Sequence, residues 1–201
     1  MKPWRLLLVA VLTWLGALPA QALVEDTAYA ATRIVRLDGR EFATQVNHTR
    51  LRERISANVG GVDVTVILRS DRNIAWQLMP MMNIYAEADV SGMDTPASVR
   101  IVSSEPMGEE TVAGRSAMKY KAVFQTRNGG QHQGFFWQDK SGVHVKQQFP
   151  VTDRDGRTRL IETELRDLRV GAQDPALFEV PEGYRHIDVD IGAVLGELFG
   201  F

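Results

Sequence analysis

Apolar and polar residues alternate with a period of two along much of the chain, and this pattern limits the fold more than any other feature. Around the dipeptide Gly60-Gly61, the apolar residues of 51–59 and of 62–68 fall mainly at every second position. Successive side chains of a strand point to opposite faces of a sheet, and adjacent glycines accept the positive φ angles of a tight turn. The segment therefore predicts a β-hairpin with one apolar face.

The same alternation continues beyond this hairpin. Strands are predicted over residues 74–80, 118–124, 131–138, 143–149 and 157–168, separated by turns rich in Gly, Asn and Asp. No helix is predicted between the strands of either half, which indicates an antiparallel meander. We therefore expect a mainly β (α+β) fold.

Few segments have a helical pattern. Short helices are predicted near residues 95–99 and after Asp174, and an amphipathic helix over residues 187–201, where glycine recurs at every fourth position from Gly192 to Gly200. Each glycine costs a helix about 1 kcal/mol relative to alanine. This C-terminal helix is therefore expected either to dock on the sheet, a membrane or a partner, or to be a frayed tail.

The N-terminus has the three parts of a secretory signal peptide. Lys2 and Arg5 precede an apolar run over residues 6–18, and Ala20 and Ala22 have the spacing of an Ala-x-Ala cleavage site. A membrane anchor is the alternative, but the run is shorter than the ~20 residues that a spanning helix needs. We expect cleavage after Ala22, with residues 23–201 forming a single domain. A second, weaker cleavage site ends at residue 30.

Composition excludes several classes of protein. The 201 residues include no cysteine, which excludes disulfides, thiolate metal sites and a lipidated lipoprotein anchor. The formal net charge of −2 argues against a nucleic-acid-binding protein, because such proteins usually have a basic excess. Export of a chain with this composition indicates the bacterial periplasm.

The sequence has no recognisable catalytic or metal-binding motif. It lacks the nucleophile elbow of hydrolases, the HExxH zinc motif and the glycine-rich loops that bind nucleotides. His132 and His144 are predicted on adjacent strands roughly 16–20 Å apart, at ~3.3 Å per residue, which is too far for one metal ion. We therefore expect no cofactor, no metal and no enzymatic activity.

Three groups of charged residues are interpreted mainly as solvated surface. They are the pair Glu109 and Glu110, the pair Glu162 and Glu164, and the stripe Arg50, Arg52 and Arg54. The arginines share one face of a predicted strand, opposite its apolar residues. Such a stripe is most often the wet outer face of a sheet, although it can also contact anionic lipid headgroups or an acidic partner.

Methionines concentrate beside two aromatic residues. Met79, Met81 and Met82 lie in sequence between Trp76 and Tyr85. Methionine is common in ordinary cores and in adaptable apolar walls around variable ligands, and thioethers also suit Cu(I). The pattern is therefore compatible with core packing, with an apolar ligand cavity and with a copper site.

Three groups of motifs occur in a fixed order along residues 29–185. They are Asp71-Arg72, Trp76, Leu78-Met79-Pro80 and Tyr85; then Glu110-Thr111-Val112-Ala113-Gly114 and Lys119-Tyr120; then Asp174-Pro175-Ala176-Leu177-Phe178 and Pro181-Glu182-Gly183-Tyr184. Together they resemble an exported bacterial family of unknown function in the superfamily of LolA-like and LolB-like periplasmic lipoprotein carriers. The resemblance implies a curved antiparallel sheet, an unclosed half-barrel, with helices over its concave face and a cavity for acyl chains or other lipid.

Our leading hypothesis is a periplasmic, non-enzymatic protein that binds a lipid or lipid-like moiety, with transient membrane contact. The candidate residues of the hydrophobic cavity are Trp76, Leu78, Met79, Met81, Tyr85, Tyr120, Phe124, Phe136 and Trp137. The first alternative is an envelope protein-protein interaction module whose core is filled by its own side chains. The second alternative is Met-based Cu(I) handling.

Overall fold

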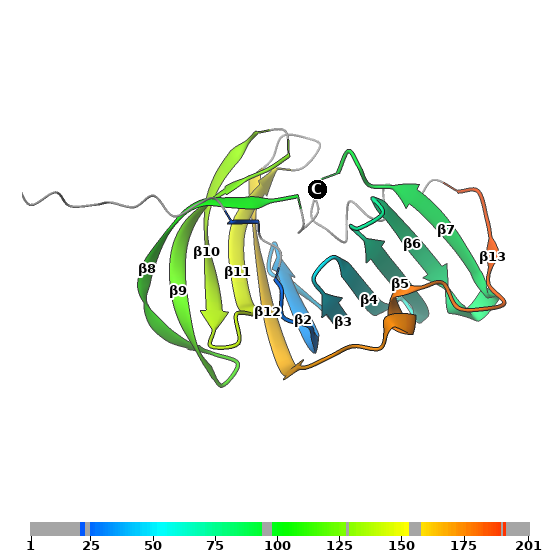
Figure 1. Cartoon of the computed structure of the whole chain (residues 1–201), viewed down its shortest axis with the longest axis horizontal. Helices are drawn as coiled ribbons and strands as arrows, with labels where there is room; N and C mark the ends of the chain where they lie inside the picture. The colour runs from blue at the N-terminus through cyan, green and yellow to red at the C-terminus, as the bar shows by residue number, and fades with distance from the viewer. Residues whose placement is uncertain are drawn as a thin grey trace, which may run out of the picture.

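The structure, a computed structural model, describes residues 21–22, 25–93, 98–127, 129–152, 158–189 and 191. Within these residues thirteen strands form one sheet (Figure 1). The strands are β1 (Gln21–Ala22), β2 (Tyr29–Leu37), β3 (Arg40–Thr49), β4 (Arg52–Val59), β5 (Val62–Arg69), β6 (Ile74–Met79), β7 (Ile84–Asp89), β8 (Arg100–Val112), β9 (Arg115–Gln125), β10 (Gln131–Asp139), β11 (His144–Thr152), β12 (Thr158–Val170) and β13 (Arg185–His186).

The strand order is β1-β8-β9-β10-β11-β12-β2-β3-β4-β5-β6-β7-β13, and the two ends of this series do not pair with each other. The predicted antiparallel meander and the unclosed sheet are therefore confirmed. The β4–β5 hairpin turns at Gly60 and Gly61, with φ angles of 60° and 88°. The pairing of β12 with β2 joins two runs of hairpins that are far apart in sequence, with Leu165 opposite Arg33.

The prediction of helices over the concave face is wrong for the described residues. Their helices are two short 3-10 segments, η1 (Pro80–Met82) and η2 (Pro175–Phe178). The segment predicted to be helical after Asp174 is η2, and it packs on the opposite face of the sheet. Of the C-terminal helix predicted over residues 187–201, residues 187–189 are not helical and residues 192–201 lie outside the described part. Residues 1–20 and 94–97, with most of the signal peptide and the predicted helix near residue 95, also lie outside it.

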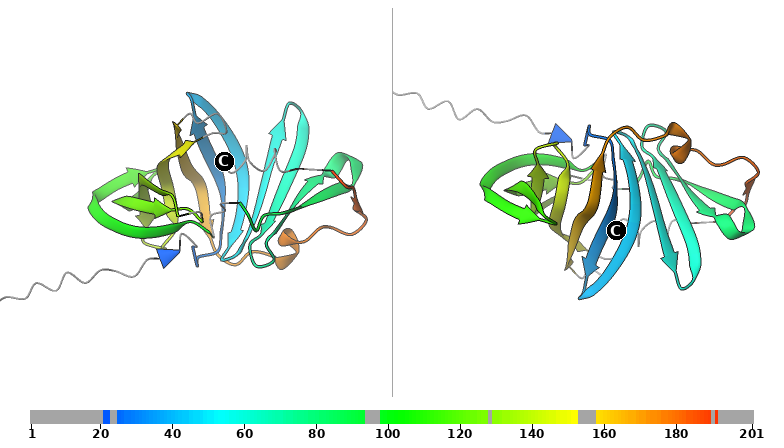
Figure 2. Two further views of the ribbon diagram at one scale, coloured as in Figure 1. Left: turned by 90° about the horizontal axis from the view of Figure 1, so that it is seen from above. Right: turned by 90° about the horizontal axis from the view of Figure 1, so that it is seen from below.

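The sheet curves toward one face, which we call the inner face and define by the side chains of Val46, Ile55 and Val66. On this face Val46 of β3 belongs to the same buried cluster as Val145 of β11 and Leu165 of β12. The cluster continues through Tyr29 and Ala31 of β2, which lies between β12 and β3 in the sheet order. Figure 2 shows that the sheet is strongly curved. The opposite face is the outer face.

After β12 the chain crosses the outer face of β4 to β6 and then turns around the last strand. This segment, residues 171–186, is the strap (orange to red in Figure 1). Its β13 pairs in parallel with β7, which covers the free edge of that strand. Beyond β13, Ile187 and Ile191 pack on the inner face against Val66 and Leu68. The C-terminal part of the described chain therefore packs on both faces of the sheet at this end.

The sheet is split between β3 and β4. Their pairing extends from Thr49 opposite Arg52 to Gln45 opposite Ser56 and stops there. Both hairpins continue past this point, because β2 pairs with β3 to its first residue and β4 pairs with β5 as far as the turn. We call this opening, bounded by residues 40–44 and 57–64, the fork; Figure 2 shows the two hairpins spreading apart.

Candidate functional site

The structure divides the residues predicted to line a hydrophobic cavity between two faces of the sheet. Trp76, Leu78 and Tyr85 share the outer face, since Leu78 pairs with Tyr85 and Trp76 is two residues from Leu78. Tyr120 and Phe136 are paired on the inner face of β9 and β10. These groups do not meet, and the ligand-binding role of the nine residues stays a prediction.

The outer group is covered by the strap. Phe178 packs into a cluster with Trp76 and Leu78, and the half-buried side chains of Leu177 and Tyr184 complete it. Leu78 has no exposed surface and Phe178 has 1% of its surface exposed. A side chain of this size contributes about 1.5–3 kcal/mol when it is fully buried. The outer group is therefore part of the protein's own core.

A buried arginine ties the strap to the sheet. The Arg69 guanidinium donates two hydrogen bonds of 2.8 Å to the Asp71 carboxylate, and it also donates to the Phe178 carbonyl oxygen and to the Glu179 carboxylate. The hydrogen bond from Arg69 holds the pKa of Asp71 below its ordinary value. The sequence motifs around Asp71 and around Phe178, about 100 residues apart in the sequence, thus meet at one place.

The inner group forms an aromatic cluster on β9 to β11. The Tyr120 and Phe136 rings stack with their centroids 4.8 Å apart, and Phe124 lies 6.0 Å from Phe149. Gly134 lies beneath Phe124 and Phe149, where a Cβ atom would come within 3.0 Å of both side chains. The space above β10 is therefore filled by the protein's own rings.

Trp137 lies on the opposite side of β10 from Phe136. Its ring is flanked by the ammonium groups of Lys119 and Lys146, at 4.9 and 5.0 Å from the ring centroid. Its Nε1 atom donates a 2.7 Å hydrogen bond to the Glu110 carboxylate. Trp137 is only 3% exposed and belongs to a buried apolar cluster with Ala117 and Val145, so it is part of the protein's own core.

The methionines predicted as cavity wall or copper ligands lie at the tip between β6 and β7. Met79 ends β6 and is half-buried, whereas 75% of Met81 and 59% of Met82 are exposed in η1. This exposure argues against core packing for Met81 and Met82. Copper binding stays a prediction.

The arginine stripe is only partly the wet surface that the sequence predicted. Arg50 pairs with Asp26 at 3.1 Å in an exposed position, and Arg52 pairs with Asp71 at 3.4 Å. Arg54 is half-buried and donates to the carbonyl oxygen of Leu177 in the strap. The stripe therefore helps to hold the strap. Of the two carboxylate pairs predicted as surface charge, Glu110 pairs with Lys119, Glu162 with Lys146 and Glu164 with Arg166, whereas Glu109 accepts a hydrogen bond from the Ser116 hydroxyl.

A network of charged side chains is buried on the inner face, and the local sequence pattern does not predict it. Arg33 of β2 donates two hydrogen bonds, of 2.7 and 3.0 Å, to the carboxylate of Glu53 on β4. The His48 ring lies 3.4 Å from the Glu53 carboxylate and 3.1 Å from the carbonyl oxygen of Glu25. The backbone N–H of His144 donates a 2.6 Å hydrogen bond to the Glu25 carboxylate.

Burial and pairing shift the pKa values of this network in opposite directions. Burial would raise the pKa of Glu53, but the charge of Arg33 and the hydrogen bonds from His48 and Arg33 outweigh it and hold the pKa well below its usual range. Burial raises the pKa of Glu25 despite the nearby His48. Burial opposes protonation of His48, but its hydrogen bond to Glu53 and the Glu53 charge raise the pKa overall. Burial, together with the His48 charge, lowers the pKa of His144 to about 4.

This network is a structural one. Its charged groups are hydrogen-bonded to each other, and buried charges are retained in proteins when they are paired in this way. Across the described ranges no group of three or more His, Asp or Glu side chains is placed to hold a metal ion. One sequence signal pointed to it, because Glu53 is a charged residue on the apolar face of a predicted strand and needs a partner there.

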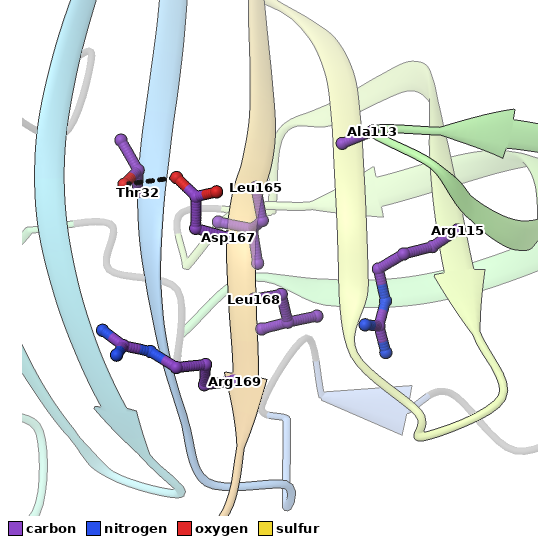
Figure 3. Close-up of a pocket in the computed structure, with 7 residues that line it drawn as sticks. All are labelled: Thr32, Ala113, Arg115, Leu165, Asp167, Leu168 and Arg169. Atoms are coloured by element: carbon purple, nitrogen blue, oxygen red, sulfur yellow. Dashed lines mark hydrogen bonds between the residues drawn. The ribbon is translucent and has the colours of Figure 1, made fainter.

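A pocket of about 600 Å³ opens where the β8–β9 turn meets β12. Asp167, at a bulge of β12 with φ 52°, accepts a 3.4 Å hydrogen bond from the Thr32 hydroxyl. Arg115 is bound to Asp139 at 2.7 and 2.9 Å. In Figure 3 the Arg169 guanidinium lies on the far side of β12 from the Arg115 side chain. The charged groups of this pocket therefore do not converge on a common ligand position.

The fold defines a class of proteins built on one long, curved, unclosed antiparallel sheet. No family model and no curated protein matches the chain. A chain of the Pseudomonas aeruginosa MucA/MucB complex matches with 15% identity and a TM-score of 0.50, covering 84% of this chain and 60% of its own. An uncharacterized conserved protein from Thermus thermophilus matches with 13% identity and a TM-score of 0.50, covering 81% of this chain and 90% of its own.

The superfamily expected from the sequence motifs is also among the matches. A LolA superfamily protein from Nitrosomonas europaea, NE2245, matches with 7% identity and a TM-score of 0.38, covering 77% of this chain and 90% of its own. At these identities the likeness is one of fold. This chain spans about 60% of the length of the matched chain from the MucA/MucB complex. In the described part of the molecule no helix is long and apolar enough to cross a membrane.

Proposed function

We propose that this protein is a non-enzymatic binding module of the bacterial envelope that holds a segment of another protein. The observation that carries the proposal is that the two candidate cavity groups, one on each face of the sheet, are packed with the chain's own side chains. Phe178 covers Trp76 on the outer face, and Phe149 packs against Phe124 on the inner face. A filled core leaves strand edges and surface side chains as the means of recognition.

The likeness to a chain of the MucA/MucB complex supports this proposal, because that structure is of a protein bound to another protein. The likeness is one of fold, so it supports the kind of function and not the identity of a partner.

The protein acts outside the cytoplasm, after removal of the first 22 residues. The structure favours this cleavage site over the one that ends at Ala30. Glu25 and Tyr29 are 8% and 3% exposed, so cleavage after Ala30 would remove two residues of the buried inner face. Cleavage after Ala22 would keep both residues and would remove β1 from the edge of β8.

The test is to cross-link the tagged protein in living cells, to purify its complexes from the envelope and to repeat the binding with the purified partner. We expect a defined protein partner that binds with one-to-one stoichiometry. Native mass spectrometry of the purified protein is the second arm. A lipid bound at one-to-one stoichiometry, without any protein partner, would contradict the proposal and support a lipid carrier.

Lipid binding is the second candidate function, and the inner aromatic cluster favours it. Ile101, Tyr120 and Phe149 are half-buried there and present apolar surface beside the buried rings of Phe124 and Phe136. A fluorescent fatty acyl probe tests this candidate directly. Binding that is lost in Tyr120→Ser would support the carrier, and a signal that is equal for the wild type and this variant would rule out this site.

A further inference from the structure

We propose that the fork between the β2–β3 and β4–β5 hairpins is the place where the partner segment binds, as an extended strand added to the open edge of β3. This inference rests on the proposed protein-binding function and names its site and the chemistry of the ligand. Strand addition to an open edge is a common way in which sheets recognise peptides, since main-chain hydrogen bonds supply affinity and alternate side chains supply specificity.

The two strands that border the fork are incompletely paired. Residues 40–44 of β3 pair with β2 on one side, but the ladder to β4 begins only at Gln45. Continued pairing would place Ala43 opposite Asn58, yet these residues are not partners. The backbone groups of β3 that point into the fork are therefore not engaged by β4, and an added strand can pair with them.

Apolar side chains are exposed at the same place. On the inner face, 52% of Phe42 is exposed on the β3 side of the fork, and 46% of Val62 is exposed at the turn end of the β4–β5 hairpin on the other side. Val64 and Ala57, on the same face, are half-buried. An apolar residue of an added strand could therefore cover the part of the Phe42 ring that the two hairpins leave exposed.

Two exposed acidic side chains lie on the outer side of the fork. Glu41 and Asp63 alternate with the apolar residues along their strands, so their side chains lie on the outer face, and both are exposed. Glu41 is bound to Arg36 at 3.0 Å, and Asp63 accepts a hydrogen bond from Asn58. A strand that alternates apolar and basic residues could place apolar side chains beside Phe42 on the inner face and basic side chains beside Glu41 and Asp63 on the outer face.

The other open edge of the sheet differs from the fork. In β8 the pairing with β9 shifts register between Ile101 and Ser103 and again between Pro106 and Gly108. A proline and irregular pairing are features by which natural sheets prevent the addition of a further strand. The described residues of the fork on β3 contain neither, because residues 40–44 pair with β2 without interruption.

The test uses purified protein and a ten-residue peptide of alternating valine and lysine, followed by fluorescence anisotropy. We expect Phe42→Ser to weaken binding by about tenfold or more, because Phe42 supplies the apolar contact. Leu160→Ser is the matched control. Leu160 is exposed to a similar extent, 56%, but lies on the outer face of β12, and its replacement is expected to leave binding within about twofold of the wild type.

Two further measurements complete the test. Amide hydrogen exchange of residues 40–44 is expected to slow when the peptide binds, and a peptide of alternating valine and glutamate is expected to bind about tenfold more weakly than the lysine peptide. Unchanged exchange over residues 40–44, or equal effects of Phe42→Ser and Leu160→Ser, would overturn the inference. A second copy of the chain in the fork, seen as self-association that Phe42→Ser abolishes, would also overturn it.

The two proposals fail in different ways. If the natural partner binds Phe42→Ser as tightly as it binds the wild type, the fork is not the site but the protein-binding function stands. If the envelope yields no protein partner at all, the function fails, whatever the peptide does.

Discussion

Arg33 and Glu53 face each other across β3, with the two guanidinium nitrogens 2.7 and 3.0 Å from the two carboxylate oxygens. The two residues belong to strands that do not pair directly, so their side chains meet over the strand between them. Glu53 is 4% exposed, which leaves its charge dependent on Arg33 and His48.

Replacement of Glu53 by Gln is expected to destabilise the protein by about 3–5 kcal/mol, because it leaves a largely buried guanidinium without its counter-charge. Urea denaturation measures the effect. Glu41→Gln is the control, because it removes a carboxylate from a more exposed pair with Arg36 and is expected to cost no more than about 1 kcal/mol. Equal losses in the two variants would show that the buried pair has no special role.

His144 is expected to make the protein less stable as the pH falls from 7 to 5. Its pKa is lowered from 6.5 to about 4, so in this range the unfolded chain takes up a proton that the folded protein does not. The linkage amounts to about 2 kcal/mol. Burial raises the pKa of Glu25, and Glu53 raises the pKa of His48. Both of these neighbours therefore make the folded protein more stable as the pH falls, which opposes the effect of His144.

The contribution of His144 is therefore measured as the difference in the free energy of unfolding between the wild type and a variant that lacks the imidazole. His144→Phe keeps a ring against Phe136, which lies 4.7 Å from the His144 ring, but has no group to protonate. The stability of this variant relative to the wild type is expected to rise by about 2 kcal/mol between pH 7 and pH 5. A constant difference across this range would contradict a buried, neutral His144.

The mature protein is expected to begin at Leu23. Intact mass spectrometry of the secreted protein checks the cleavage site. A chain that begins at Ala31 is expected to be at least about 4 kcal/mol less stable than one that begins at Leu23, because it lacks the buried ring of Tyr29 and the Glu25 carboxylate that binds the His144 amide. Equal stability of the two chains would show that residues 23–30 are not part of the folded core.

Replacement of Phe178 by Ala is expected to cost about 3–5 kcal/mol, because it leaves a cavity over Trp76 and Leu78. The loosened strap should then be cleaved by protease faster than the rest of the chain. Met82→Ala, at a position that is 59% exposed, is the control and is expected to change stability by less than about 0.5 kcal/mol. A strap that stays resistant in Phe178→Ala would mean that its polar contacts and its pairing with β7 hold it without the Phe178 ring.

The hairpins could be predicted from the sequence because they depend on neighbours in the chain. Gly60-Gly61 and the flanking alternation define β4 and β5 almost to the residue. The buried network could not be predicted in the same way. It brings residue 25 beside His48 and His144, and these contacts exist only because the curved sheet brings strands of the two halves together.

The candidate cavity shows a related limit of sequence reasoning. Alternation places Trp76 and Phe136 each on an apolar face, but it does not say whether two apolar faces are the same face of the final sheet. The order of the strands decides this, and it places Trp76 under the strap and Phe136 on the inner face. Aromatic residues with similar local patterns thus became parts of separate clusters.

The pairing of β2 with β12 has a consequence for the time at which the molecule can fold. β2 obtains one neighbour, β3, from the residues that follow it directly, but its other neighbour is complete only at Val170. Contacts between residues so distant in sequence slow folding, since a long loop must close before they form. β2 therefore cannot complete its pairing until nearly the whole chain is available, which favours late closure of the middle of the sheet.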